Sequence, residues 1–442
     1  SSNDFLLKNG VVEKAGFSIS SGLGIRYLIN DTPGFVSINR LDKELVKRLL
    51  ERSISLTKDS SRISKRTCFS DEKTRKDDYK VKQKIGLNDL EADEKMKVLQ
   101  DIEKELNSLK VKVPGRYLSL SDALIKKYYV NSEGSKVSSE IPKINFFYFL
   151  TVLVDNQQIQ RFWQYGSSSG YEILEEWNLK EKLRDEVLGM EKNAKHGVKA
   201  PAKKLDVVCS PEVAGIIAHE AAGHPYEADR ILGRESAQAG ESFVTKEMIN
   251  TRIGSEVVNL VDDPTVKNSF GFYKYDDEGV KARQKLLIRK GIINEFLHNR
   301  ETAKELGTKS NASARANGFD VEPLIRMSNT FFLPGEYGDD EIIEDTKIGI
   351  YFKNFMEWNI DDVRLNQKYV ANEAYLIENG ELTRPVKRPA IEITTPVLYS
   401  SINAVAKTVE LHAATCGKGE PMQGIPVTMG GPRIRIANIR VH

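Results

Sequence analysis

The sequence predicts an α+β protein with an N-terminal α/β domain over residues 1–195 and a mostly β domain over residues 205–442. Three observations support this prediction. The first half alternates apolar runs of strand type with long stretches of helical periodicity. The second half consists mainly of short strands separated by Gly, Pro, Asp and Asn. Between them, residues 192–204 are basic, contain Gly and Pro and break helical periodicity, so we place the domain boundary there.

The N-terminal domain is expected to contain a β-sheet with flanking helices. Residues 16–39 have the composition of strands around a Gly-rich turn. Residues 142–166 predict a β-hairpin, because the apolar strand 146–154 leads into the turn pair Asp155-Asn156 and a second alternating run. Amphipathic helices, each with one apolar face, are expected over residues 41–56 and 89–109, and a third helix is expected over residues 176–195.

The C-terminal domain is expected to open with a strand at residues 205–209. Ser210 then fits the N-cap of a helix, with Pro211 at its first position and Glu212 near the positive end of the helix dipole. Short strands between turn residues follow, and they predict an antiparallel, barrel-like sheet. These strands are expected over residues 257–261, 349–352, 374–377 and 434–439.

The composition indicates a cytoplasmic enzyme. Lys and Arg number 65 and Asp and Glu number 63, so the formal charge of +2 provides no general electrostatic attraction to nucleic acid. Three cysteines cannot all pair, which favours a reducing compartment. No apolar run is long enough to span a bilayer and no signal-peptide pattern is visible, so we expect no membrane association.

Segment 58–84 is a local exception to this charge balance. It carries ten Lys or Arg and five Asp or Glu residues, with few aromatic residues and little apolar periodicity. Because such charge runs are usually solvated, we favour a mobile basic loop over a nucleic-acid patch.

The chemistry of the chain is concentrated in one run, His219-Glu220-Ala221-Ala222-Gly223-His224. Neutral imidazole nitrogens can hold a zinc ion, and a neighbouring glutamate can take and return protons. The chain has only six histidines, so two of them flanking a glutamate this closely form an informative pattern.

The HExxxH spacing is one residue longer than the zincin HExxH, and this constrains the backbone. Residues five apart sit about 140° apart around an ideal helix, whereas residues four apart sit about 40° apart. Both histidines can therefore meet one ion only if the helix loosens or ends between them. A π-type turn would realign them, or Gly223 and Pro225 would interrupt the helix around His224.

A catalytic zinc site usually has three protein ligands, and Cys416 is the best candidate for the third. It lies in a Gly-rich stretch over residues 415–424, where the backbone can approach a site closely. Glu227, Asp229 and His412 compete for this role. We favour Cys416 as the ligand, with Glu227 and Asp229 orienting the ligating imidazoles.

These residues make the chain resemble the TldD/PmbA family of metallopeptidases, on the TldD-like side that carries the histidine motif. The resemblance spans most of residues 205–442, with a weaker match at residues 21–26. The matching stretches are residues 219–229, 276–279, 326–330, 373–380, 385–387, 416–418 and 430–436.

The resemblance implies a zinc-dependent peptidase with His219, His224 and Cys416 as ligands and Glu220 as the general base. It also implies hydrolysis of unfolded peptides with little sequence specificity. The implied assembly is a homodimer or a heterodimer with a PmbA-like subunit, the branch that lacks the histidine motif. The chain departs from the family at residues 354–359, where bulkier side chains replace a Gly-rich stretch, and in its late-starting N-terminus.

Two functions of other classes remain open. The chain could be a non-catalytic, zinc-containing binding or regulatory subunit of a TldD/PmbA-type complex. A metal site closed by four protein ligands, for example with Glu227 added, would favour that function. A nucleic-acid-associated factor working through residues 58–84 is the other alternative.

Overall fold

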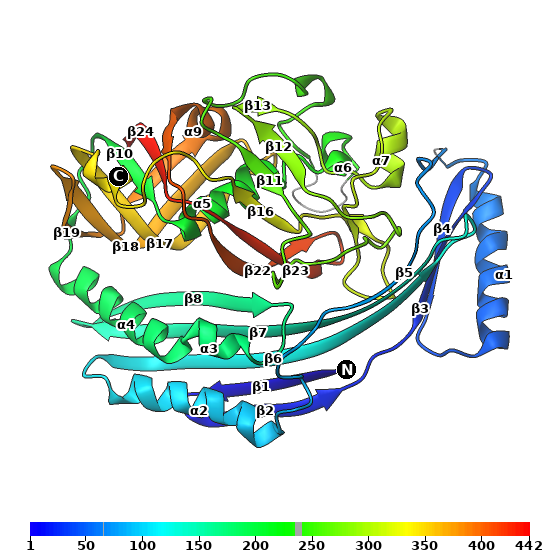
Figure 1. Ribbon diagram of the computed structural model, residues 1–442, viewed down its shortest axis with the longest axis horizontal. Helices are drawn as coiled ribbons and strands as arrows, with labels where there is room; N and C mark the ends of the chain where they lie inside the picture. Colours follow the sequence, from blue (N-terminus) through cyan, green and yellow to red (C-terminus); the bar gives the residue numbers. More distant parts are fainter. Residues whose placement is uncertain (65, 235–240) are drawn as a thin grey trace.

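The computed structural model describes residues 1–64, 66–234 and 241–442 and has an α+β architecture (Figure 1). Its N-terminal part is built on a long, curved sheet in the order β2-β1-β6-β7-β5, with β8 paired to β7. This sheet extends beneath the C-terminal part of the molecule (Figure 1). Its strands are β1 (Ser2–Lys8), β2 (Val11–Ser18), β5 (Lys76–Lys80), β6 (Lys112–Val130), β7 (Lys136–Val154) and β8 (Gln157–Ser167).

Helices α2 (Ala92–Ser108) and α4 (Leu179–His196) pack against one face of this sheet. The predicted start of the helix over residues 176–195 is wrong. Asn178 adopts a left-handed φ of 44° and separates α3 (Ile173–Trp177) from α4. Helix α2 buries the apolar face that its periodicity predicts, namely Met96, Leu99, Ile102 and Leu106.

The hairpin predicted around Asp155-Asn156 is confirmed as β7 and β8. Both turn residues have left-handed φ angles, 47° and 64°, which suit a two-residue hairpin turn. A second hairpin, β3 (Leu23–Ile29) and β4 (Thr32–Ile38), packs against α1 (Lys43–Ser60). Its turn falls at Asn30-Asp31 and not at the glycines that the sequence suggested, because these two residues adopt the left-handed conformation.

The C-terminal part contains two large open sheets. One has the order β21-β24-β10-β17-β18-β19-β9, with β20 paired to β18, and the other has the order β13-β12-β11-β16-β23-β22. The first comprises β9 (Val198–Lys199), β10 (Lys204–Cys209), β17 (Ile348–Ile360), β18 (Asn366–Glu378), β19 (Glu381–Lys387), β20 (Ala390–Thr394), β21 (Ile402–Val405) and β24 (Ile434–Arg440). The second comprises β11 (Leu260–Asp262), β12 (Lys285–Arg289), β13 (Ile292–Ile293), β16 (Asn329–Phe332), β22 (Glu410–Lys418) and β23 (Gln423–Gly431).

The barrel-like expectation is wrong, because no sheet of the described residues closes on itself. Instead, helix α5 (Pro211–Ala218) fills the space between the two open sheets. It contacts β10 and β17 on one side and β16, β22 and β23 on the other, and all its residues are buried. The shorter helices of this part are α6 (Ala228–Ile231), α7 (Arg300–Glu305), α8 (Glu341–Glu344) and α9 (Thr395–Ser401).

The expected loop over residues 58–84 is wrong where Lys58–Ser60 complete α1 and where Lys76–Lys80 form a strand, and Lys65 lies outside the described residues. Lys76–Lys80 form β5, which pairs in parallel with β7. Ser70 exchanges hydrogen bonds with Arg300 in the C-terminal part, and Asp77 pairs with Lys274 at 2.6 Å. The segment therefore joins the two parts of the molecule. No helix of the described residues is long and apolar enough to cross a membrane.

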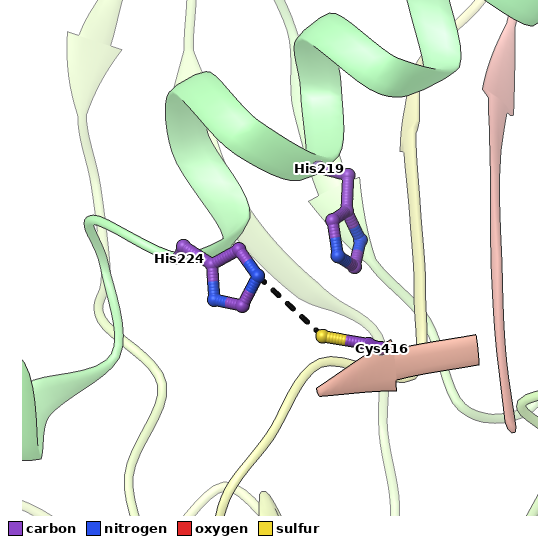
Figure 2. Close-up of side chains that lie close together, drawn as sticks. All are labelled: His219, His224 and Cys416. Atoms are coloured by element: carbon purple, nitrogen blue, oxygen red, sulfur yellow. Dashed lines mark hydrogen bonds between the residues drawn. The ribbon is translucent and has the colours of Figure 1, made fainter. Parts of the chain in front are cut away.

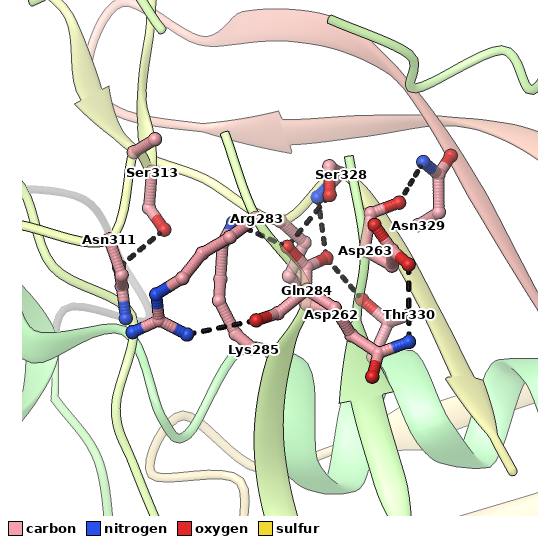
Figure 3. A network of polar contacts seen from close by, with 12 residues as sticks. Asp262, Asp263, Arg283, Gln284, Lys285, Asn311, Ser313, Ser328, Asn329 and Thr330 are labelled. Atoms are coloured by element: carbon pink, nitrogen blue, oxygen red, sulfur yellow. Dashed lines mark hydrogen bonds and ion pairs between the residues drawn. The ribbon is translucent and has the colours of Figure 1, made fainter. Parts of the chain in front are cut away.

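A buried polar network supports the sheet that contains β11 and β16 (Figure 3). Lys285 donates to Asp262 at 2.8 Å, and both side chains have zero exposure. Asp262 also accepts from the backbone and hydroxyl of Ser328, each at 2.7 Å, and from the hydroxyl of Thr330 at 3.1 Å. Burial raises the pKa of Asp262, but Lys285 and Ser328 lower it more, so the net pKa lies below its usual range. The carboxylate is thus held ionised inside the protein.

Lys285→Met should lower the free energy of unfolding by ~3–5 kcal/mol, because it leaves the Asp262 charge buried without its cation. Urea denaturation of the purified chain measures this change. Arg289→Met, an exposed position on the same strand, is the matched control and should change stability by less than ~0.5 kcal/mol. Similar small losses for both variants would contradict the prediction.

Candidate metal centre

Helix α5 begins where the sequence predicts. Strand β10 ends at Cys209, and the Ser210 hydroxyl then accepts from the Val213 backbone at 3.3 Å, with Pro211 at the first helical position. Glu212 in the first turn accepts from Arg161 of β8 at 2.8 Å. This buried ion pair ties the start of the helix to the N-terminal sheet.

The helix then continues as a π-helical turn over His219–Gly223. The backbone N–H of His224 donates to the carbonyl of His219 at 3.1 Å, which is the i to i+5 bond of a π turn. The structure therefore takes the first of the two routes that the sequence allowed. The two imidazole rings end 4.9 Å apart between centroids, at an angle of 84°. A Cβ on Gly223 would lie 1.8 Å from Met327 Sδ, so any side chain at this position would require the buried Met327 side chain to move.

His219, His224 and Cys416 form a buried cluster (Figure 2). One ligand atom from each lies within 4.8 Å of the others, and Cys416 Sγ is 3.4 Å from His224 Nε2. Both imidazoles project from the helix end toward the cysteine on β22 (Figure 2). His219 Nδ1 is buried and has no hydrogen-bond partner among the described residues. A metal ion would satisfy such an orphaned nitrogen, so the residues fit the ion that the sequence predicts.

The protonation states of the cluster favour metal binding. Burial lowers the pKa of His219, which keeps the imidazole neutral with its lone pair available. Burial raises the pKa of Cys416, but His224 and Arg326 lower it more, so the thiol has a net pKa below its ordinary value. Arg326 also donates to the Cys416 carbonyl and, at 2.8 Å, to the Gln423 carbonyl. Two imidazole nitrogens and a readily ionised sulfur form a donor set typical of zinc.

Glu227 holds His224 in place. Its Oε2 lies 3.1 Å from His224 Nδ1, 2.8 Å from Arg230 Nε and 3.2 Å from Lys418 Nζ. Burial raises the pKa of Glu227, but Lys418, His224 and Arg230 hold it well below its usual range. When His224 Nδ1 donates to this carboxylate, Nε2 faces Cys416 with its lone pair.

The other residues that the sequence singled out lie farther from the cluster. Asp229 accepts from Lys418 Nζ at 2.8 Å through both oxygens, so it supports the cation that contacts Glu227. His412 packs edge-on against Trp163, with the ring centroids 5.7 Å apart, and is not a member of the cluster.

Arg364, which the sequence did not point to, holds Glu220 by donating to its carboxylate at 2.7 Å. The Trp358 indole also lowers the pKa of this carboxyl group. Burial raises the pKa of Glu220, but His224 and Arg364 lower it more, so the net pKa lies below its usual range. Arg364 lies in the turn between β17 and β18, and the sole signal for this region was the bulky stretch at residues 354–359.

Known proteins resemble this chain along its whole length. Three family models match in order: the PmbA/TldA metallopeptidase domain 1 at residues 1–57, the central domain at 85–195 and the C-terminal domain at 202–442. A metalloprotease of Methanocaldococcus jannaschii is 34% identical over 98% of this chain and 93% of its own length. A zinc metalloprotease TldD homolog of Saccharolobus solfataricus is 25% identical over 96% and 90% of the two chains.

The fold also matches solved structures. TldE from Thermococcus kodakarensis superposes with a TM-score of 0.75 at 19% identity, covering 100% of this chain and 94% of that chain. At this level of identity the likeness establishes the shared fold.

Gly223→Ala should weaken the affinity for Zn²⁺ and lower the free energy of unfolding by ~1–3 kcal/mol, because the new methyl group would overlap Met327. Competition with a chromophoric chelator measures the affinity, and urea denaturation measures the stability. Gly16→Ala is the control, since its Cβ would meet only Lys14 at 3.9 Å. Unchanged affinity in Gly223→Ala would show that the π turn tolerates the methyl group.

Proposed function

Because the chain belongs to the PmbA/TldD metallopeptidase family, we propose that it is a zinc-dependent peptidase. In this proposal, His219, His224 and Cys416 hold the zinc and Glu220 is the general base. One observation carries the proposal: two imidazoles from the π turn and the Cys416 thiol of β22 place three buried ligand atoms within 4.8 Å of one another, next to the ionised carboxylate of Glu220.

His219, His224 and Cys416 would hold the zinc ion, which when bound would supply a water of lowered pKa and polarise the scissile carbonyl. Glu220 accepts the proton of the attacking water and passes it to the leaving amine. Its low pKa keeps the carboxylate ionised at neutral pH, and Arg364 and Trp358 limit its rotation. Glu227 keeps the His224 ring oriented through Nδ1. The chain therefore contributes both a fixed base and fixed ligands.

The proposed substrates are unfolded peptides, bound with little sequence specificity by pairing of the peptide backbone with a strand edge. Strand β22, which carries Cys416, is an edge strand of its sheet and supports this proposal. We assign the metal centre to a C-terminal domain over residues 205–442 and the sheet beneath it to an N-terminal domain over residues 1–195.

A PmbA-like subunit or a second copy of this chain is the proposed partner. The fold shared with TldE supports an assembly of two related subunits. A non-catalytic zinc-containing subunit is the alternative. Glu227 is not among the clustered ligand atoms and its Oε2 contacts His224, Arg230 and Lys418, which argues against a metal site closed by four protein ligands.

Elemental analysis should find about one zinc per chain in the wild type, as expected for a site with three protein ligands. Cys416→Ser should lose most of this zinc, because a hydroxyl is a much weaker ligand than a thiolate. Cys68→Ser, at an exposed position, is the control and should retain it. A wild type that takes up no zinc after incubation with the ion would overturn the proposed cofactor.

Glu220→Gln should retain zinc and lose hydrolysis of a fluorogenic peptide by ~10²–10⁴-fold, since it removes the proton acceptor without removing a ligand. The assay is run on the chain alone and after mixing with a PmbA-like subunit. Glu191→Gln, on the surface of α4, is the control for a lost carboxylate. Activity within a few-fold of the wild type would remove Glu220 as the base.

A further inference from the structure

One face of the N-terminal sheet carries four aromatic side chains that are not fully buried. We name this the aromatic face, and its members are Tyr117 of β6, Phe147 and Phe149 of β7 and Phe162 of β8. Phe149 is the register partner of both Tyr117 and Phe162. Phe147 lies 6.1 Å from Tyr117 and 6.4 Å from Phe162 between ring centroids.

The two faces of this sheet have different roles. Side chains on the opposite face, including Phe146, Tyr148 and Leu150, are fully buried, and α2 and α4 pack on the sheet there. The aromatic face instead remains partly open, and Phe162 retains 36% of its exposure. Partly exposed apolar clusters of this kind mark binding surfaces.

The aromatic face reaches the strand next to the candidate metal centre. Gln164, on the same face of β8, donates to the Thr415 hydroxyl at 3.0 Å. Thr415 directly precedes Cys416, whose buried side chain points to the opposite face of β22. Strand β8 lies next to β22 in the fold (Figure 1). The aromatic face thus borders the strand that carries the proposed cysteine ligand.

A line of ring contacts also connects this face to the proposed base. Phe162 meets Phe355 edge-on at 5.7 Å, and Phe355 meets Trp358 edge-on at 4.9 Å. Trp358 is partly exposed, and its indole lowers the pKa of the Glu220 carboxyl group. The ring of Phe355 therefore connects the rings of Phe162 and Trp358. The distance across these two contacts is at most about the length of three residues of extended chain, at ~3.3 Å each.

The polar residues that flank the phenylalanines on β7 and β8 are uncharged, namely Asn145, Thr151 and Gln164, whereas β1 brings Asp4 and Lys8 to the same face as register partners of Ser121 and Tyr117. A charged side chain placed at the β7 and β8 end of this face would lose hydration without gaining a counter-charge from Asn145, Thr151 or Gln164. A bulky apolar side chain would instead remove its own surface and that of the rings from water, which is favourable.

We propose that the aromatic face and Trp358 form a substrate subsite that takes a bulky apolar side chain of the peptide. The inference rests on the proposed peptidase function and adds a side-chain preference to it. Backbone pairing would align the peptide. The subsite would then favour peptides with Phe or Leu at one position over peptides with Ser or Asp at that position.

The test measures binding separately from turnover. Zinc-loaded Glu220→Gln is titrated with dye-labelled peptides that carry Phe, Leu, Ser or Asp at each of four successive positions, and fluorescence anisotropy reports the affinity. We expect a preference of ~10-fold or more for Phe and Leu at one position. Adding Phe162→Ser or Trp358→Ala should reduce that preference to within about two-fold, while Phe162→Leu should retain it.

Tyr128→Ser is the matched control, because Tyr128 is a strongly exposed aromatic residue of β6 outside the aromatic face, and it should leave the preference unchanged. A preference that persists in Phe162→Ser and Trp358→Ala would overturn the subsite. So would a change of oligomeric state in Phe162→Ser with unchanged peptide selectivity, since the face would then be a subunit interface.

The two proposals fail in different ways in these experiments. A Glu220-containing, zinc-loaded chain that binds apolar peptides selectively and hydrolyses none would remove the peptidase function and leave the subsite. A chain that hydrolyses peptides at equal kcat/KM whatever the side chain at the four positions would remove the subsite alone.

Discussion

The hydrogen bond from the His224 N–H to the His219 carbonyl is the constraint on which the candidate centre depends. It inserts one extra residue into a helical turn and brings two imidazoles five residues apart to the same side. The turn can be held because α5 is enclosed between two sheets and Gly223 lies directly against Met327. Without this bond, an ideal helix would direct the two rings to different sides of its axis.

Buried charges then hold the surroundings of this turn in one arrangement. Cys416 and Lys418 lie two residues apart on β22, so one strand carries both the thiol and a cation that contacts Glu227. The network around Asp262 holds Ser328, next to the methionine that packs on the turn. Breaking either set would leave an uncompensated charge inside the protein, which makes alternative arrangements costly.

Local sequence signals predicted much of this site. Spacing and propensity predicted the capping residue Ser210, the strand before it, and either a π turn or a break between the two histidines. The structure contains the cap, the strand and the π turn. The contacts of Arg364 and Trp358 with Glu220 could not be predicted, because they join segments more than one hundred residues apart. The same limit applies to β5, whose pairing with β7 depends on a partner far along the chain. The division at Asn178 depends on a single left-handed residue that helical periodicity does not detect.

The hairpin of β17 and β18 has a consequence for how such a centre can change. The proposed ligands come from the α5 segment and β22, whereas the groups that hold Glu220 come from this separate hairpin. A substitution in the hairpin would therefore alter the proton affinity of the base without removing a proposed ligand, although the charge of Arg364 also acts on His219. The strength of the base can consequently be adjusted by mutation while the set of ligands stays complete.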